Sequence, residues 1–381
     1  MRTEARIDLD AIESNVAALA AAAAGGAQVM VVVKADGYGH GLLPSAQAAV
    51  RGGAAWLGVA FLEEAFALRA AGVDVPVLAW LTTPGEDLAR AVTAGIDLGA
   101  YDRGQLDAAA SAARAAGTTA RVQLKADTGL SRGGATPDAW PDLCAAAARA
   151  EAGGEVRVTG LWSHFAFADG GPDHPTNTRQ AAVFAEALEV ADRAGLRPDV
   201  RHLANSAATL TAPATHYDLV RPGLAAYGLS PVPDLGAPAD YGLRPAMTLA
   251  STVALVKRVP AGTGVSYLHR YVTSGETSLA LVPLGYADGV PRAATSTGQV
   301  QLGGRRRTIA GTVCMDQFVL DVGDDTVRAG DEVLLFGPGD DGEPTAQDWA
   351  DALGTINYEI VTRIGARVPR VLVGAAAPVA S

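Results

Sequence analysis

Several residues of this chain combine a reactive side chain with a position at the end of an apolar run. Lys34 is the clearest case, because it directly follows the apolar run 29–33 and precedes the glycine-rich segment 35–41. An amine at the end of a buried strand is partly desolvated, which lowers its pKa and leaves it nucleophilic toward an aldehyde. A lone lysine there is more often a solvent-exposed or ion-paired side chain, so its neighbours must decide between the two explanations.

A second group of charged residues follows another apolar run. Lys125 comes directly after the run 120–124, and Asp127 and Arg132 lie shortly beyond it. Taken alone, these three residues are explained by ordinary ion pairs. Further polar residues accompany other apolar runs: His164 and Asn205 each follow one, and Arg221 lies within another. A fold that gathers the ends of these runs would collect amines, an imidazole and a guanidinium in one site.

The elements that must position these residues alternate along the chain. Between residues 28 and 227, short apolar runs alternate with alanine-rich stretches that are typical of helices. Eight such runs lie at residues 29–33, 56–60, 75–80, 96–100, 120–124, 156–162, 200–203 and 219–224. Eight strands that are each followed by a helical segment predict an α/β fold, a (β/α)8 barrel, whose reactive residues lie at the carboxyl ends of the strands.

After residue 240 the chain becomes rich in valine and threonine and is interrupted by glycine and proline. This pattern predicts strands within 247–259, 278–283, 300–311, 314–322 and 332–336, and one short helix at 346–353. We therefore predict two domains, a barrel at residues 1–240 and a mostly β C-terminal domain at residues 241–381. Residues 1–10 could pack with the second domain.

The composition argues against several classes of partner. The net charge is −11 and the basic residues are spread along the chain, so nucleic-acid binding is not expected. The first residues lack the pattern of a signal peptide, and no apolar run is long enough to cross a membrane, which predicts a cytoplasmic protein without membrane attachment. The six histidines include no His-x-His or His-Glu-x-x-His pair, so no metal site is predicted.

The segment around Lys34 carries a specific resemblance. Residues 32–41 read Val-Val-Lys-Ala-Asp-Gly-Tyr-Gly-His-Gly. They resemble the cofactor-lysine segment of the alanine racemase family, which are fold-type III pyridoxal-phosphate enzymes. The resemblance implies that the barrel binds pyridoxal 5'-phosphate, that Lys34 carries the cofactor as a Schiff base, and that Tyr38 lies beside it.

The segment Leu-Lys-Ala-Asp-Thr-Gly-Leu-Ser-Arg-Gly at residues 124–133 resembles the next motif of the same family. In that family the lysine of this motif is often carbamylated. The resemblance implies that a carbamate on Lys125 fixes Arg132, whose guanidinium then contacts the phenolic oxygen of the cofactor and approaches the substrate carboxylate.

Four further segments resemble parts of the family's cofactor site. Trp-Ser-His-Phe at residues 162–165 implies that His164 lies near the pyridine ring and helps to position a catalytic tyrosine. Arg-Pro-Gly-Leu at 221–224 implies that Arg221 meets the pyridine nitrogen, and because arginine keeps its proton, the ring would be a weak electron sink. The phosphate would be held by residues of these segments and of two others: Asn205, Ser206, Gly223, Leu224 and Tyr358. Taken alone, Ser206 is explained equally well as a helix N-cap.

Racemisation needs two bases, because the proton leaves one face of the α-carbon and returns to the other. Gly-Val-Ser-Tyr at residues 264–267 resembles the family segment of the catalytic tyrosine. Tyr267 would act on the L-enantiomer and Lys34 on the D-enantiomer. Met315 would bind the substrate carboxylate through its backbone N–H, while Tyr286, Arg292 and Asp169 would line the substrate entrance. In this family the tyrosine and methionine segments come from the partner subunit, which implies a homodimer with two shared sites.

The predicted function is therefore the interconversion of L- and D-alanine, which would supply D-alanine for cell-wall peptidoglycan. One departure bears on the substrate: Leu268 follows Tyr267 where the family commonly has glycine, so serine or a broader set of amino acids is an alternative. An amino-acid decarboxylase of the same fold type fits less well, because its glycine-rich phosphate loop and cysteine-containing acidic motif are not found. A pyridoxal-phosphate carrier without activity would not need Tyr267.

Overall fold

The computed structural model describes residues 2–375 and divides the chain into two compact units. The first, which we call the barrel unit, comprises Ile12–Gly37 and Leu42–Leu243. The second, the β-rich unit, comprises Met1–Ala11, Tyr38–Gly41 and Arg244–Ser381. Each unit is described by itself below.

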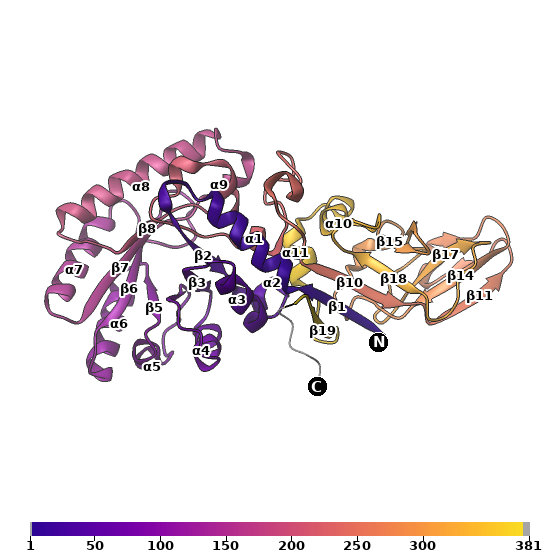
Figure 1. Ribbon diagram of the computed structural model, residues 1–381, viewed down its shortest axis with the longest axis horizontal. Coiled ribbons are helices and arrows are strands. Elements are labelled where there is room, and N and C mark those ends of the chain that lie inside the picture. The colour runs from indigo at the N-terminus through magenta and orange to yellow at the C-terminus, as the bar shows by residue number, and fades with distance from the viewer. Residues whose placement is uncertain (1, 376–381) are drawn as a thin grey trace. The chain divides into compact units, whose positions relative to one another are not determined.

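Eight parallel strands form the sheet of the barrel unit (Figure 1). Their order is β8, β7, β6, β5, β4, β3, β2, β9. Hydrogen bonds from Asp218 N to Arg201 O (3.1 Å) and from Arg221 N to Ala204 O (2.9 Å) join the two ends of this order, so the sheet closes into a barrel. Each predicted apolar run overlaps one strand, which confirms the predicted fold; the strands are β2 (Gln28–Val32), β3 (Trp56–Val59), β4 (Val77–Ala79), β5 (Asp97–Ala100), β6 (Ala120–Lys125), β7 (Val156–Trp162), β8 (Val200–His202) and β9 (Leu219–Val220).

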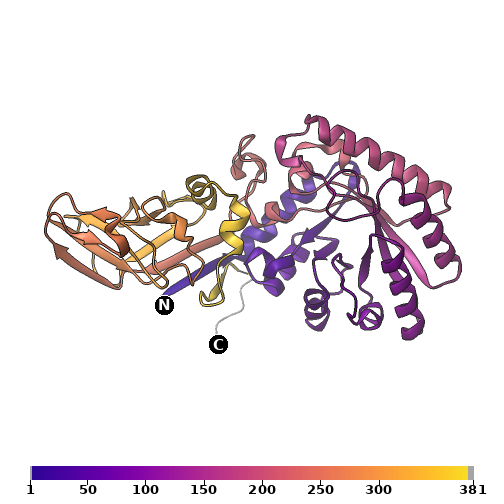
Figure 2. The ribbon, with the colours of Figure 1, turned by 180° about the vertical axis from the view of Figure 1, so that it is seen from behind.

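Helices surround this sheet, as Figure 2 shows from behind. Alanine favours them, and aspartate caps three of them: Asp8 accepts from Ala11 N, Asp87 from Arg90 N and Asp102 from Gln105 N. The helices are α1 (Leu9–Ala22), α3 (Leu42–Arg51), α4 (Leu62–Ala70), α5 (Leu88–Thr93), α6 (Arg103–Ala116), α7 (Trp140–Ala152), α8 (Pro175–Arg193) and α9 (Ser206–Thr211). After β9 the chain forms a 3-10 turn, Leu224–Tyr227, in place of an α-helix. Among the described residues, no helix has both the length and the apolar character needed to cross a membrane.

The β-rich unit contains three sheets, with strand orders β16-β15-β18-β10-β1-β19, β11-β14-β17 and β12-β13. Two predicted strands are each two strands, because turns interrupt them: 247–259 divides into β10 and β11, and 300–311 into the hairpin β15–β16 with Gly303 and Gly304 at its turn. The run 314–322 becomes a strand only from Phe318. The strands are β1 (Thr3–Asp8), β10 (Met247–Thr252), β11 (Leu255–Val259), β12 (Gly264–Val265), β13 (Tyr271–Val272), β14 (Thr277–Val282), β15 (Gln299–Leu302), β16 (Arg305–Thr308), β17 (Phe318–Gly323), β18 (Glu332–Phe336) and β19 (Arg370–Val373).

Both ends of the chain enter the six-stranded sheet. β1 pairs antiparallel with β10 and parallel with β19, and the apolar run patterns predicted neither β1 nor β19. The predicted helix 346–353 is α10 (Ala346–Leu353), and a second helix, α11 (Asn357–Thr362), was not predicted.

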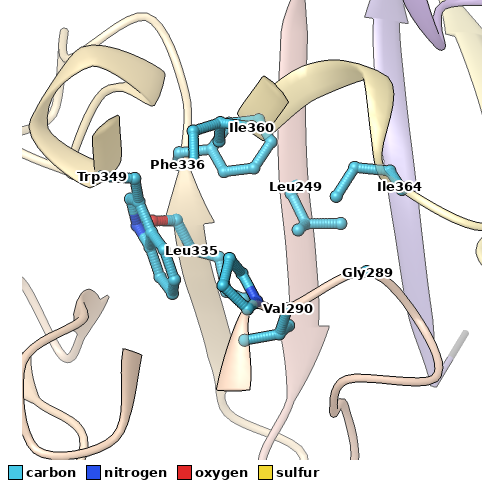
Figure 3. Close-up of a pocket in the computed structure, with 9 residues that line it drawn as sticks. Leu249, Gly289, Val290, Leu335, Phe336, Trp349, Ile360 and Ile364 are labelled. Atoms are coloured by element: carbon cyan, nitrogen blue, oxygen red, sulfur yellow. The ribbon is translucent and has the colours of Figure 1, made fainter. Parts of the chain in front are cut away.

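Helices α10 and α11 pack on the apolar side chains of this sheet (Figure 3). The Trp349 Nε1–H donates to Leu335 O at 2.7 Å, so the buried indole has a partner. The side chains leave a cavity of only about 10 Å³, whose apolar lining offers a water no hydrogen bond; it is lined by Leu249, Gly289, Val290, Pro291, Leu335, Phe336, Trp349, Ile360 and Ile364. The β-rich unit therefore has a well-packed core of its own.

Candidate active site

Lys34 begins a strained turn at the carboxyl end of β2. The short helical segment α2 (Lys34–Tyr38) has left-handed backbone angles, with φ of 54° at Ala35 and at Asp36. Residues with a Cβ resist this conformation by about 1–2 kcal/mol each, so other contacts must hold it. The Ala35 N–H donates to Glu64 Oε1 at 2.7 Å, and the Leu42 N–H donates to Asp36 Oδ1 at 2.8 Å. The turn fixes the point at which the Lys34 side chain leaves the strand.

The amine of Lys34 lies 5.9 Å from the ring centre of Trp80. Burial and the positive charge of Arg132 lower the pKa of Lys34, and the carboxylate of Glu64 opposes them. No carboxylate of residues 2–375 lies within ion-pair distance of this amine. Lys34 is therefore suited to act as a nucleophile or base rather than as half of a salt bridge.

Lys125, at the end of β6, is only 5% exposed. Its Nζ lies 4.6 Å from the ring centre of Trp162 and 4.9 Å from that of Tyr101. Burial, Arg132 and Arg221 lower the pKa of Lys125 to about 8. The ion pair with Asp127 that would explain this lysine does not form, because Asp127 Oδ1 instead accepts from the backbone N–H groups of residues 129 and 131. The amine of Lys125 thus lies among rings and cations.

Arg221 follows β9, and its guanidinium is surrounded by acceptors that fix its plane. Nη2 donates to Ser163 O at 2.7 Å and to Leu203 O at 3.2 Å. Nη1 lies 3.0 Å from His202 Nδ1, and Nη2 lies 3.2 Å from His164 Nδ1. Burial lowers the pKa of Arg221 to about 9, so the group still carries its charge at neutral pH.

His164, after β7, is neutral. Burial lowers its pKa well below the usual value, and the charges of Arg221, Arg132, Lys125 and Lys34 act in the same direction. Because a guanidinium can only donate, the hydrogen bond with Arg221 makes His164 Nδ1 an acceptor. The proton of the neutral imidazole is then on Nε2, where it can be donated to a further group.

Asn205 and Ser206 follow β8 and have different roles. The side chain of Asn205 accepts from Ala208 N at 3.1 Å and caps α9, so the N-cap is Asn205 and not Ser206. Ser206 Oγ instead accepts from Gly223 N at 2.9 Å and from Ala225 N at 3.3 Å. Since its lone pairs are used by these donors, the hydroxyl proton of Ser206 remains for an anion. Leu224, next to Gly223, is fully buried.

Sequence reasoning missed the aromatic residues of this site. Trp80 and Trp162 lie 6.2 Å apart between ring centres, and Tyr101 donates a hydrogen bond to Trp80 O. Their faces carry negative partial charge, which stabilises Lys34, Lys125 and Arg221 without a carboxylate. The only signal in the sequence was the position of each aromatic residue directly after or at the end of an apolar run. The barrel unit thus presents a positive site suited to a multiply charged anion.

Two tyrosines of the predicted cofactor site, Tyr38 and Tyr358, belong to the β-rich unit. The rings of Tyr38 and Tyr358 have their centres 6.3 Å apart. Tyr38 is buried, and burial raises the pKa of its hydroxyl, so this group is a donor at neutral pH. Tyr358 lies in the first turn of α11.

Tyr267 lies in a strained and exposed loop of the β-rich unit. Positive φ angles occur on both sides of it, at Ser266 (60°), Leu268 (61°) and His269 (44°). The side chains of Tyr267 and Leu268 are 71% and 76% exposed. The backbone is nevertheless held, because Thr312 Oγ1 donates to Tyr267 O and Ser266 Oγ donates to Thr312 O, both at 2.8 Å. Leu268 therefore adopts the conformation that glycine would adopt without strain.

The segment 312–315 forms hydrogen bonds both with the loop of Tyr267 and with the segment that contains Tyr286. Tyr286 N donates to Cys314 O at 3.0 Å, and Ala287 N donates to Met315 O at 2.9 Å. Tyr286 and Met315 are both exposed, as is Tyr267. The structure thus brings these three predicted residues onto one hydrogen-bonded framework. The predicted entrance residues Arg292 and Asp169 belong to different units. Arg292 begins a 3-10 turn of the β-rich unit, and Asp169 lies in a 3-10 turn of the barrel unit.

Comparisons with known proteins agree along the whole chain. Residues 7–231 match the family model "Alanine racemase, N-terminal domain", and residues 246–372 match "Alanine racemase, C-terminal domain". The chain is 66% identical over 370 residues to the alanine racemase of Frankia casuarinae, covering 97% of this chain and 96% of that protein. It is 64% identical over 372 residues to that of Thermobifida fusca, covering 98% of each.

Solved structures give the same result. The crystal structure of alanine racemase from D-cycloserine producing Streptomyces lavendulae has a TM-score of 0.97 and 56% identity, covering 98% of both chains. That of Streptomyces coelicolor A3(2) has a TM-score of 0.96 and 58% identity with the same coverage. The chain is therefore an enzyme of the alanine racemase family.

Proposed function

We propose that this chain interconverts L- and D-alanine with pyridoxal 5'-phosphate as its cofactor. The observation that carries the proposal is the group of cations at the barrel rim: Lys34, Lys125, Arg132 and Arg221, none of which forms an ion pair within residues 2–375. Lys125 and Arg221 are each 5% exposed and Lys34 is half-buried, whereas Arg132 is exposed. Burying charge without an ion-pair partner is costly, and a phosphate dianion with an ionisable phenolic oxygen would offset it. The family's name supports alanine as the substrate.

The donors of the barrel unit fit this cofactor. The hydroxyl of Ser206 and the backbone near Gly223 and Leu224 would hold the phosphate, with Asn205 fixing the start of α9. Tyr358 would contact the phosphate, and Tyr38 would lie beside the cofactor. Arg221 would donate to the pyridine nitrogen, and Arg132 to the phenolic oxygen. When bound through Lys34, the cofactor would withdraw electrons from the α-carbon of the substrate and make its proton acidic.

Two residues would move the proton. Lys34, whose pKa burial and Arg132 lower, would serve as base for D-alanine. Tyr267 would serve for L-alanine from the opposite face. His164 supports this role, because its Nε2–H can donate to a phenolate while Arg221 holds its Nδ1. The Met315 N–H would bind the substrate carboxylate, and Tyr286, Arg292 and Asp169 would line the entrance.

A second copy of the chain would complete each site. Tyr267, Leu268 and Met315 are largely exposed apolar or aromatic side chains on one hydrogen-bonded framework. Such a patch is unusual on a surface that stays in water. We infer a homodimer in which these residues cover the partner's barrel, so that the barrel at residues 1–240 supplies the cofactor site and the domain at residues 241–381 supplies the second base.

Lys125 is proposed to be carbamylated. Its pKa of about 8 leaves about a tenth of the amine neutral at pH 7, far more than for an ordinary lysine. The neutral amine would add to CO2, forming an N–C bond and releasing one proton, and the resulting anion would accept from Arg132. Carbon-13 bicarbonate should give one slowly exchanging carbamate signal, absent in Lys125→Met. A spectrum without that signal at saturating bicarbonate would contradict the modification.

The preferred substrate and the physiological role are part of the proposal. Alanine is the expected substrate, and D-alanine would enter peptidoglycan. The strained Leu268 beside Tyr267 favours testing serine and larger amino acids as well. The cytoplasmic location stays a prediction.

The decisive experiment exploits the scarcity of lysine, since Lys34, Lys125 and Lys257 are the three lysines of the sequence. Purified protein with pyridoxal phosphate should absorb visible light, and borohydride should abolish this band while attaching the cofactor to the peptide that contains Lys34. The same protein should exchange the α-proton of alanine with solvent deuterium. Absence of a visible band would contradict the cofactor, release of CO2 from an amino acid would favour a decarboxylase, and a band without exchange would favour a non-catalytic protein.

A further inference from the structure

A series of buried polar side chains crosses the interior of the barrel. It comprises Asp97 on β5, Gln123 on β6 and His202 on β8, and it ends at Arg221. The first three side chains belong to fully buried residues. Barrel interiors are usually filled by branched apolar residues, so polar groups here need a reason and a complete set of partners.

The series begins at a carboxylate, which can only accept hydrogen bonds. Asp97 accepts from Arg121 Nε at 2.6 Å, from Thr159 Oγ1 at 2.5 Å and from Gln123 Nε2 at 3.0 Å. Because Asp97 accepts, the amide of Gln123 must present its NH2 group to Asp97 and its Oε1 to the other side. The orientation of the Gln123 side chain is therefore set by Asp97.

That orientation determines the tautomer of His202. Gln123 Oε1 lies 2.8 Å from His202 Nε2 and can only accept, so Nε2 must carry the proton. Burial and the charge of Arg221 keep the pKa of His202 well below its usual value, so the imidazole is neutral. Nδ1 is then an acceptor for Arg221 Nη1 at 3.0 Å. In this series, the donor and acceptor of each hydrogen bond therefore determine which atom donates in the next.

The local packing provides space for this arrangement. A Cβ added to Gly160 on β7 would lie 2.7 Å from Gln123 Oε1 and 2.8 Å from its Cδ, so the glycine accommodates the amide. Trp162 stacks on His202 with an interplanar angle of 2° and a centre distance of 5.8 Å. The amide and the imidazole are thus held in position by neighbours as well as by their hydrogen bonds.

We propose that Asp97 and Gln123 are positioning residues that fix the tautomer of His202 and, through it, the orientation of the Arg221 guanidinium. Neither residue lies at the carboxyl end of its strand, so neither contacts the substrate. With Nη1 committed to His202 and Nη2 shared among Ser163 O, Leu203 O and His164 Nδ1, the guanidinium has one plane. If His202 carried its proton on Nδ1 instead, this N–H would face the N–H of Arg221 Nη1. Two donors repel each other, so Nη1 would be displaced.

The test compares variants that remove a hydrogen bond between Asp97 and His202, or allow it to reverse, with a control variant that leaves these bonds in place. Asp97→Asn keeps the shape but allows the Gln123 amide to turn over, and Gln123→Leu removes the link to His202. The matched control is Thr159→Val, because Thr159 is equally buried and also donates to Asp97, but it is not between Asp97 and Arg221. All three variants lose buried hydrogen bonds, so a loss of stability that is common to them does not separate the variants that break the series from the control.

The first measurement is the nitrogen-15 spectrum of histidine-labelled holoenzyme, with the His202 signals assigned by their loss in His202→Gln. In the unaltered protein and in Thr159→Val, His202 should carry its proton on Nε2 only. Asp97→Asn and Gln123→Leu should shift it to a mixture of tautomers or to the Nδ1 form. An unchanged tautomer in both would overturn the proposal, whether or not the enzyme is a racemase.

The second measurement rests on the proposed function. Transamination moves the amino group of alanine to the cofactor and releases its carbon skeleton as pyruvate, and it competes with return of the proton to the α-carbon. A displaced Arg221 should raise pyruvate formed per racemisation by about tenfold, the factor that corresponds to one net hydrogen bond. A tautomer shift with unchanged pyruvate, or an equal rise in Thr159→Val, would show that the series only stabilises the barrel and would overturn its role at Arg221.

Discussion

The two proposed bases of this enzyme stand in opposite surroundings. Lys34 belongs to a site whose charges are held among buried rings and hydrogen bonds of the barrel. Tyr267 belongs to a loop with three positive φ angles and is 71% exposed in a single chain. The difference suggests that burial within one chain tunes the first base, whereas the second base depends on what covers it.

Both regions store strain, but they store it differently. At Lys34 the left-handed turn is compensated locally by Glu64 and Asp36. At Tyr267 the backbone is held by Thr312, while the side chains of Tyr267 and Leu268 remain largely in solvent. Strain without compensating burial is expected where a further contact is formed on assembly. Four predictions test this comparison.

Lys34→Ala should have the largest effect, because it removes both the proposed cofactor anchor and one base. We expect alanine racemisation to fall by at least about 10³-fold and the visible absorption band to disappear. D-alanine formation and the absorption spectrum measure the two effects. Lys257→Ala, on the exposed strand β11, is the control and should change neither. A retained band would assign the anchor to Lys125.

Tyr267→Phe should keep the visible band but reduce α-proton exchange from L-alanine by about 10²–10⁴-fold. Exchange from D-alanine should continue, because Lys34 would remove and return the proton on its own face. Net racemisation must fall equally in both directions, since the equilibrium constant is fixed. Deuterium exchange into each enantiomer measures the difference. Tyr271→Phe, whose hydroxyl donates to Asp321, should exchange both normally.

Lys125→Met should stabilise the protein in CO2-free buffer. The folded pKa of Lys125 is about 8 and the unfolded value about 10.4, so the unfolded chain binds more protons between these pH values. The free energy of unfolding should therefore rise with pH over that window, and the substitution should remove this rise. At pH 7 the gain is up to about 3 kcal/mol. Denaturant unfolding across pH measures it, with Lys257→Met as the unaffected control.

Leu268→Gly should have the smallest effect. Relief of the positive φ at this residue outweighs the greater entropy of unfolded glycine by about 0.5–1 kcal/mol. Thermal unfolding at low protein concentration should show a higher midpoint. Leu255→Gly, at another exposed leucine within β11, should instead lower the midpoint, because it reduces the free energy of unfolding by about 1 kcal/mol. Equal losses in both variants would mean that Leu268 is not strained.

Most of the fold could be predicted because each barrel strand is a continuous apolar run between alanine-rich helices. The errors in the predicted elements have physical causes. β1 alternates buried and half-buried residues within a segment rich in charge, Thr3–Asp8, and its partner β19 lies at the far end of the chain. Predicted strands were too long where a turn, as at Gly303 and Gly304, interrupts an apolar stretch. Short-range patterns cannot report pairing between the two ends.

The sequence by itself determined which residues could react and on which strand ends they lie, because strand length and side-chain type are local properties. Only the tertiary structure decided their states. Asp127 turns to its own backbone and leaves Lys125 among rings, and Ser206 accepts from Gly223 while Asn205 caps the helix. The direction of every hydrogen bond from Asp97 to Arg221 depends on atoms from three strands and from the residue that follows β9, since donors and acceptors are matched only when the barrel has closed.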